Sequence, residues 1–234
     1  MKRPLSVLSA ALFVSAASSA FAASCGSLAS PTACSATIGG NIQFDASVFQ
    51  LANASGTKVY QAADILIDLS VSGTTAVLTF SKSPNTPTTG TTFFVNSGDT
   101  AGMVVSYTAA ITPLAAGTVA FTGASVVSPM STAGNGFASV QFSIPSMATC
   151  QVLPSAIDDT AVCTLPSGLG TSTAAGNLVS LSGNTGNAAI LRFANVFDTS
   201  FTAAPTSGVP EPSSFALIGL GISGLAWFRR RAAH

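Results

Sequence analysis

The middle of this 234-residue chain contains short segments in which apolar and polar residues alternate. Every second residue is Ile, Leu or Val between positions 65 and 71, and a similar apolar spacing returns between 138 and 144. Because successive side chains of a β-strand point to opposite faces, this period of two predicts strands with one buried face. Further strands are expected at 76–81, 91–96, 103–110, 118–127 and 188–197.

Segments rich in Gly, Pro, Asn and Ser separate these predicted strands. Many short strands joined by such turns favour an all-β fold, an antiparallel β-sandwich of which a jelly roll is one form. In the last predicted strand, the alternation places Ala189, Leu191, Phe193 and Phe197 on the buried face. The segment 167–187 is rich in Gly, Ser, Thr and Asn, and this composition predicts a mobile loop.

The amino terminus has the three parts of a secretory signal peptide. Met1-Lys2-Arg3 is a positive start, and an apolar segment that would form a short signal helix follows it. Ala20 and Ala22 are spaced as in a small-x-small cleavage site, so cleavage before Ala23 would remove 1–22. An N-terminal membrane anchor is the alternative, but the apolar run is short for a membrane span.

Three features follow one another at the carboxyl terminus. Val209-Pro210-Glu211-Pro212 is expected to be an extended strip, because proline fixes its own φ and restricts the residue before it. The uncharged stretch 213–228 would form about 24 Å of transmembrane helix at about 1.5 Å per residue. That length is marginal for a hydrocarbon core of about 30 Å. Arg229, Arg230 and Arg231 would then form a stop on the cytoplasmic side.

This order of a Pro-Glu-Pro strip, an apolar helix and an arginine cluster resembles the PEP-CTERM sorting signal of Gram-negative bacteria. The resemblance implies that exosortase, a membrane transpeptidase, recognises Val209, Pro210, Glu211 and Pro212. It also implies that the sorting signal 209–234 first anchors an intermediate in the inner membrane. Cleavage at the Pro-Glu-Pro motif then removes the helix and Arg229–Arg231 before the protein reaches the cell surface or extracellular matrix. The signal peptide itself predicts that signal peptidase acts at the amino terminus. Many such proteins accompany exopolysaccharide and biofilm production. A tail anchor that stays in the membrane is the alternative.

Between the terminal segments, 23–201 is long enough for one exported β-domain, and 202–208 is expected to be a linker. This domain carries three basic and seven acidic residues. It therefore lacks the basic patch that would neutralise phosphates, and the sequence predicts no nucleic acid partner.

All four cysteines, Cys25, Cys34, Cys150 and Cys163, lie in this domain. Export would place them in an oxidising compartment, and their spacing is unlike that of zinc-ligand pairs. Of the three possible connectivities, Cys25 with Cys34 and Cys150 with Cys163 is favoured, because each pair closes a short loop.

The side chains of common catalytic mechanisms are missing from the predicted domain. The single histidine is His234 and the single glutamate is Glu211, both in the carboxyl-terminal segment. A Ser-His-Asp triad and a typical catalytic zinc site are therefore excluded, and neither a cofactor nor an enzymatic activity is expected.

Aspartates remain as candidate acids or metal ligands. Asp64 and Asp68 would share a solvated strand face. At about 3.3 Å per residue, they would lie about 13 Å apart, a larger separation than that of the two carboxyl groups in a glycosidase. Asp158 and Asp159 are a candidate calcium site, with a solvated turn as the alternative, because the acidic spacing of known calcium loops is missing. An aspartate-dependent hydrolase is the least favoured function.

The expected function is that of an exported structural or adhesive protein of the cell surface or matrix. The alternative is a module that binds polysaccharide or another ligand. In that case Tyr60 or Tyr107 would supply an exposed aromatic contact at a loop end.

Overall fold

A computed structural model describes residues 21–32, 34–84, 90–145, 148–154, 160–163 and 170–205. Over these residues the fold is all-β with one short 3₁₀-helix, η1 (Ala62–Asp64), and no α-helix. Every strand ladder whose register is described is antiparallel, so the predicted antiparallel all-β class is confirmed. Among these residues, no helix has the length and hydropathy to cross a membrane. The predicted membrane helix at 213–228 lies outside them.

The chain divides into two compact units, Met1–Thr202 and Ala203–His234. The sheets lie in the first unit, apart from Ala203, the last residue of β16. The largest sheet has seven strands in the order β13-β9-β16-β6-β5-β1-β2. Their bounds are Thr160–Cys163 for β13, Gly117–Val127 for β9, Arg192–Ala203 for β16, Thr75–Lys82 for β6, Ile65–Ser72 for β5, Phe21–Ser27 for β1 and Ser30–Pro31 for β2.

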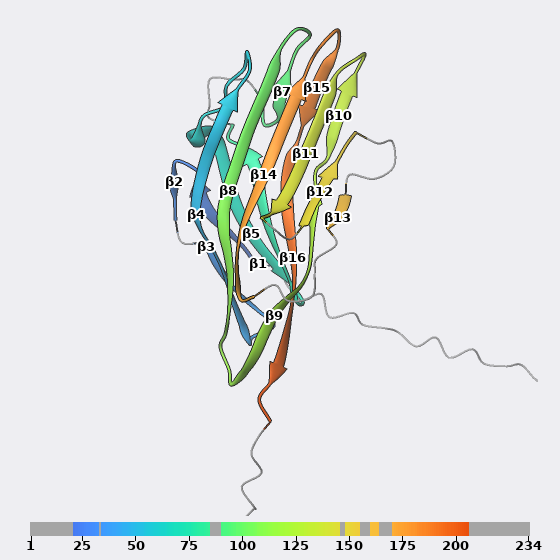
Figure 1. The fold of residues 1–234 in the computed structure, drawn as a ribbon. Helices are drawn as coiled ribbons and strands as arrows, with labels where there is room; N and C mark the ends of the chain where they lie inside the picture. The colour runs from blue at the N-terminus through green and yellow to red at the C-terminus, as the bar shows by residue number, and fades with distance from the viewer. Residues whose placement is uncertain are drawn as a thin grey trace, which may run out of the picture. The chain divides into compact units, whose positions relative to one another are not determined.

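The second sheet has six strands in the order β12-β11-β14-β8-β4-β3. Their bounds are Ala148–Val152 for β12, Phe137–Ile144 for β11, Ser172–Ser182 for β14, Thr100–Pro113 for β8, Ile42–Ser55 for β4 and Cys34–Ile38 for β3. Figure 1 shows β4, β8, β14 and β11 side by side as long strands.

A third sheet has the order β10-β15-β7, with bounds Met130–Ala133, Asn187–Ile190 and Phe93–Val95. This order repeats that of β9-β16-β6, because β10 follows β9, β15 precedes β16 and β7 follows β6 along the chain. The backbone N–H of Leu191 donates to the carbonyl of Pro129 at 3.0 Å where the strands are interrupted. The small sheet therefore continues three strands of the large one past a break (Figure 1).

Aromatic side chains from the two large sheets meet in the core. Phe44 of β4 lies 5.6 Å from Phe197 of β16, and Phe142 of β11 lies 6.0 Å from the same ring, measured between ring centroids. Phe80 of β6 lies 5.7 Å from Tyr107 of β8. The strand alternation that predicted β5 and β11 is confirmed, because the apolar residues at 65–71 and 138–144 are buried as expected.

The predicted strand at 188–197 is in fact two strands, β15 and β16, in different sheets. The prediction that Ala189 and Leu191 are buried is wrong: Leu191 is 46% exposed, and Ala188 and Ile190 face the core instead. The interruption at Leu191 shifts the alternation by one residue. Beyond it, Phe193 and Phe197 are buried as predicted.

The predicted mobile loop at 167–187 is also wrong over its described part, from 170 onward. It contains β14, which lies between β11 and β8 and bonds to both. Its alternate residues are buried: Thr173, Ala175, Asn177, Val179 and Leu181. The first three of them are small or polar. Two flanking ladders hold a strand whose composition alone favours a loop.

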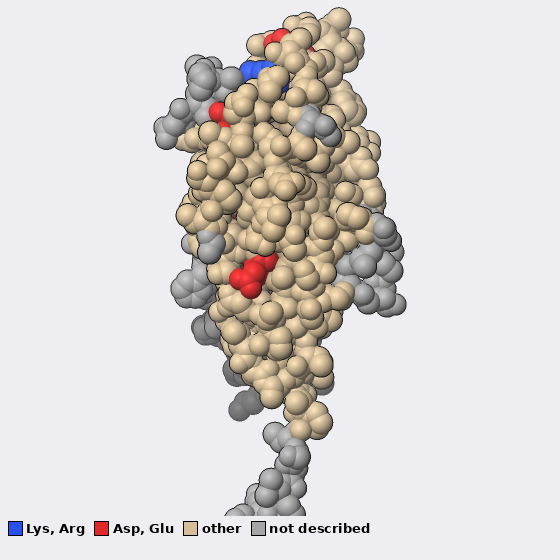
Figure 2. Space-filling view, turned by 60° about the vertical axis from the view of Figure 1, so that its left-hand side comes forward, with Lys and Arg blue, Asp and Glu red and all other residues tan. Residues whose placement is uncertain are grey.

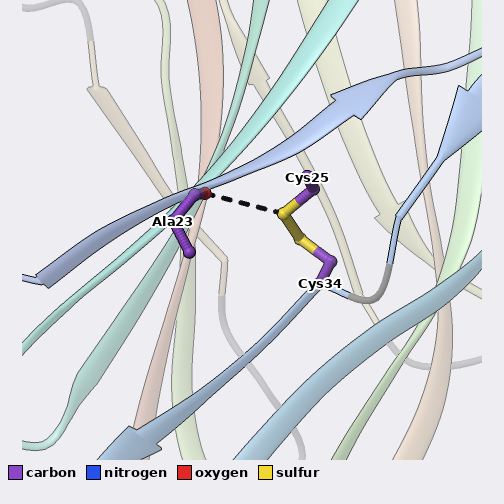
Figure 3. The surroundings of a disulfide bond; sticks show 3 residues. All are labelled: Ala23, Cys25 and Cys34. Carbon is purple, nitrogen blue, oxygen red and sulfur yellow. Dashed lines mark hydrogen bonds between the residues drawn. A yellow bond between two sulfur atoms is a disulfide. The ribbon is translucent and has the colours of Figure 1, made fainter.

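Cys25 and Cys34 form a disulfide, as predicted, and Figure 3 shows the bond beside the Ala23 carbonyl oxygen, 3.7 Å from the Cys25 sulfur. The bond joins β1 of the seven-stranded sheet to β3 at the edge of the six-stranded sheet. Cys150 is disulfide-bonded too, whereas the side chain of Cys163 lies outside the described ones. Since β12 and β13 are the opposite edges of the two sheets, the predicted second pair would join those edges.

Candidate functional site

Several predicted site residues lie outside the described part of the chain. They are Ala20, Asp158, Asp159, Val209, Pro210, Glu211, Pro212, Arg229, Arg230 and Arg231. At the predicted signal cleavage site, the backbone of Ala22 pairs with Ser70 and that of Ala23 with Leu69. Cleavage between them remains a prediction.

The prediction that Asp64 and Asp68 share a solvated strand face is wrong. Asp64 ends η1 and is buried, and its carboxylate accepts a hydrogen bond from the backbone N–H of Gln61 at 2.7 Å. The 3₁₀ turn removes Asp64 from β5, where Asp68 alone is found, opposite Thr79. Asp64 is thus a structural residue that closes the turn.

Tyr60 is buried, which contradicts its prediction as an exposed ligand contact. Its hydroxyl donates to the carbonyl of Phe94 at 3.1 Å and accepts the Phe94 N–H at 2.7 Å. Because β7 is the last strand of the small sheet, this one hydroxyl satisfies the two backbone groups of Phe94 at a sheet edge. Burial raises the pKa of Tyr60 above its ordinary value.

Tyr107 is buried as well, so neither tyrosine can serve as an exposed aromatic platform. Its hydroxyl donates at 2.7 Å to Oδ1 of Asn195, which also accepts from Nδ2 of Asn177 at 2.7 Å. Nδ2 of Asn195 returns a bond to Oδ1 of Asn177 at 2.9 Å. This network joins β8 and β14 to β16 across the core, and desolvation raises the pKa of Tyr107 well above its ordinary value.

A groove of about 330 Å³ crosses the outer face of the six-stranded sheet. Four of its positions form one row in register across four strands: Gln50 of β4 opposite Ser106 of β8, Ser106 opposite Gly176 of β14, and Gly176 opposite Ser143 of β11. No hydrogen bond joins the side chains of Gln50, Ser106 or Ser143 to any other residue that the structure describes. Their donors and acceptors are therefore open to solvent or to a ligand.

Apolar side chains, together with Thr108, form the walls of this groove. Val104 lies on one side of the polar row, and Ala174 and Pro145 lie on the other. Val48 adds to the wall from a β-bulge in β4, with φ at 55° and 65% of its surface exposed. The bulge changes the phase of β4, so that Phe49 turns inward and stacks on Tyr107 at 5.8 Å.

Gly176 forms the low point in the middle of the row, although the backbone does not require glycine there. Its φ is outside the left-handed region, and an added Cβ would meet its nearest atom, the Val105 carbonyl oxygen, at an ordinary contact distance of 3.5 Å. Glycine weakens a strand interior and often marks a place where another molecule approaches closely.

Sequence reasoning missed Gln50, Ser106, Ser143 and Gly176 as a set. The signal that could have found them is the single Gly176 within the alternation of 172–182, but its polar composition predicted a loop instead. The register that brings the four residues together is set by tertiary strand pairing.

The described residues define an antiparallel all-β domain with a disulfide between its sheets and an uncharged groove on one outer face. The family model of the PEP-CTERM protein-sorting motif matches residues 208–231, so the chain carries a PEP-CTERM sorting signal, as its sequence predicted. Such a signal indicates an exported protein that exosortase, a membrane protein, sorts through a membrane-anchored intermediate. The comparisons with curated proteins and with solved structures found no match.

Proposed function

We propose that this protein is a structural or adhesive component of the cell surface or extracellular matrix, delivered there by cleavage at its carboxyl-terminal signal. The observation that carries the proposal is a PEP-CTERM motif at 208–231 on the same chain as a disulfide-linked β-domain. Disulfides persist in oxidising compartments outside the cytosol, in agreement with export. We infer that the two packed sheets are the layers of a β-sandwich.

Three of the five described aspartates support a structural role over a catalytic one. The carboxylate of Asp198 accepts a hydrogen bond from Thr75 at 2.9 Å, and that of Asp99 accepts one from Thr57 at 3.0 Å. With Asp64 bound to the backbone of its own turn, these three carboxylates each stabilise local structure. Charged side chains are few and scattered on the face in Figure 2, which suits a protein that contacts neutral material.

The sorting step is tested in cells that contain an exosortase, with Glu211→Ala as the variant. We expect the unaltered chain to be found shortened at the surface or in the medium, and most of the Glu211→Ala protein to stay at full length in the membrane fraction. Thr206→Ala, in the predicted linker, is the matched control and should be processed normally. Normal processing of Glu211→Ala would refute sorting through this motif.

A ligand-binding module remains the second candidate function, but the feature that supports it is not the one that the sequence predicted. Both tyrosines are buried, whereas the groove between β4 and β11 presents free hydroxyl and amide groups on the outer surface. This groove, and not an aromatic platform, favours the second candidate.

A further inference from the structure

We propose that the groove across β4, β8, β14 and β11 binds a neutral oligosaccharide chain. The inference rests on the proposed function in that an exported protein meets such chains outside the cell. The polar row from Gln50 to Ser143 spans four strands, or about 14 Å at about 4.8 Å per strand spacing. That length accommodates several units of an extended chain laid across the strands.

The chemistry of the row matches a polyhydroxylated ligand. The hydroxyls of Ser106 and Ser143 and the amide of Gln50 can each donate and accept, as sugar hydroxyls do. Walls such as Val104 and Ala174 offer apolar contact to the C–H faces of a sugar ring. Among the residues that the structure describes, no charged side chain lines the groove, so a charged polymer would lose water without gaining an ion pair.

An extended peptide fits this groove less well. Peptides commonly add to a sheet edge, where free backbone groups bond to their main chain. Here the floor consists of strands paired on both sides: β8 lies between β14 and β4, and β14 lies between β11 and β8. Their backbone groups are already used in ladders, which leaves side-chain hydroxyls and the amide as the partners for a ligand.

Gly176 supplies the independent argument for close approach of a ligand. Any Cβ at this position would stand in the middle of the polar row, between Ser106 and Ser143. Since neither the backbone φ nor the space under Gly176 demands glycine, its effect is to keep the floor low where the ligand would cross.

The test is calorimetric titration of the protein, purified as its cells export it, with cellohexaose, laminarihexaose and isomaltohexaose, and with an alginate hexamer as the charged probe. We expect at least one neutral hexasaccharide to bind and the alginate hexamer not to bind. Ser106→Ala combined with Ser143→Ala should weaken that binding at least tenfold. Gly176→Leu should abolish it, and Gly176→Ala, which the space permits, should weaken it.

Ser180→Ala is the matched control, because Ser180 lies on β14 outside the groove, and it should bind as the unaltered protein does. Near-ultraviolet circular dichroism of each variant verifies its fold. The proposal is overturned if no neutral probe binds, if alginate alone binds, or if the groove variants bind normally. A dimer that Gly176→Leu dissociates would assign the face to a second copy and also overturn it. Surface delivery is measured separately, so its success or failure is distinguishable from that of sugar binding.

Discussion

At the scale of single residues, three buried polar side chains form a network within a core that is mostly aliphatic and aromatic. Tyr107, Asn177 and Asn195 are almost completely buried, and the hydrogen bonds among them join the two large sheets. A buried polar group costs free energy unless it is bonded, so these three side chains favour one register of the sheets over alternatives. The sequence does not reveal this network, because the pairing of Tyr107, Asn177 and Asn195 depends on the packing of the two sheets.

This network predicts a loss of stability at alkaline pH. The folded-state pKa of Tyr107 is raised by desolvation, so the folded protein holds the phenol proton after the unfolded chain has released it near pH 10. Stability contributed by the neutral phenol is therefore complete below about pH 10 and falls as the pH rises toward the folded pKa. Melting temperatures from pH 8 to 11 should fall steeply above pH 10.

The Tyr107→Phe variant separates this effect from other alkaline changes. At pH 7 we expect it to lose about 1 kcal/mol, the typical net value of one hydrogen bond, and to show a flatter decline above pH 10. Tyr60→Phe serves as a comparison, because Tyr60 has a smaller rise in pKa. An identical alkaline slope in Tyr107→Phe and the unaltered protein would contradict the assignment.

At the scale of elements, the edge of the small sheet is protected by a side chain. β7 has only one neighbouring strand, and the Tyr60 hydroxyl occupies both backbone groups of Phe94 on its free side. The Tyr60 ring also packs edge-on against Phe93 at 5.2 Å, which fixes the hydroxyl in place. Unpaired edges are sites of strand addition between molecules, so Tyr60 acts against association.

Tyr60→Phe should therefore expose the β7 edge while leaving the ring packing intact. We expect concentration-dependent association of this variant by analytical ultracentrifugation under conditions where the unaltered protein is monodisperse. Thr92→Ala, just before β7 and without a described side-chain bond to this edge, is the control. A Tyr60→Phe protein that sediments as the unaltered one does would show that other features protect the edge.

The elements also show which signals the sequence carries. Strong alternation of large apolar residues predicted β5, β6, β8, β9 and β11 correctly, because burial of one face dominates those strands. It failed for β14, where Asn177 and Thr173 take inward positions, and for β4, where the bulge at Val48 reverses the phase. The groove was unpredictable for the same reason, since it needs β4 and β14 in register with β8.

At the scale of the whole molecule, disulfides stabilise the domain and the carboxyl-terminal signal directs its export. The Cys25–Cys34 bond joins the sheets at one edge, and a Cys150–Cys163 bond would join them at the other. A disulfide that closes a short loop, such as that between Cys25 and Cys34, typically adds about 2–4 kcal/mol to the free energy of unfolding. Such stabilisation suits an exported domain. The motif at 208–231 marks the chain for export.

The central claim, an exported and trimmed β-domain with two cross-links, is tested most directly by the intact mass of the protein from the surface or medium fraction. The predicted mass is that of a chain that begins at Ala23, ends near the Pro-Glu-Pro strip and has lost four hydrogen atoms to two disulfides, apart from any attached glycan. A full-length chain with reduced thiols, recovered from the cytosol, would contradict the account.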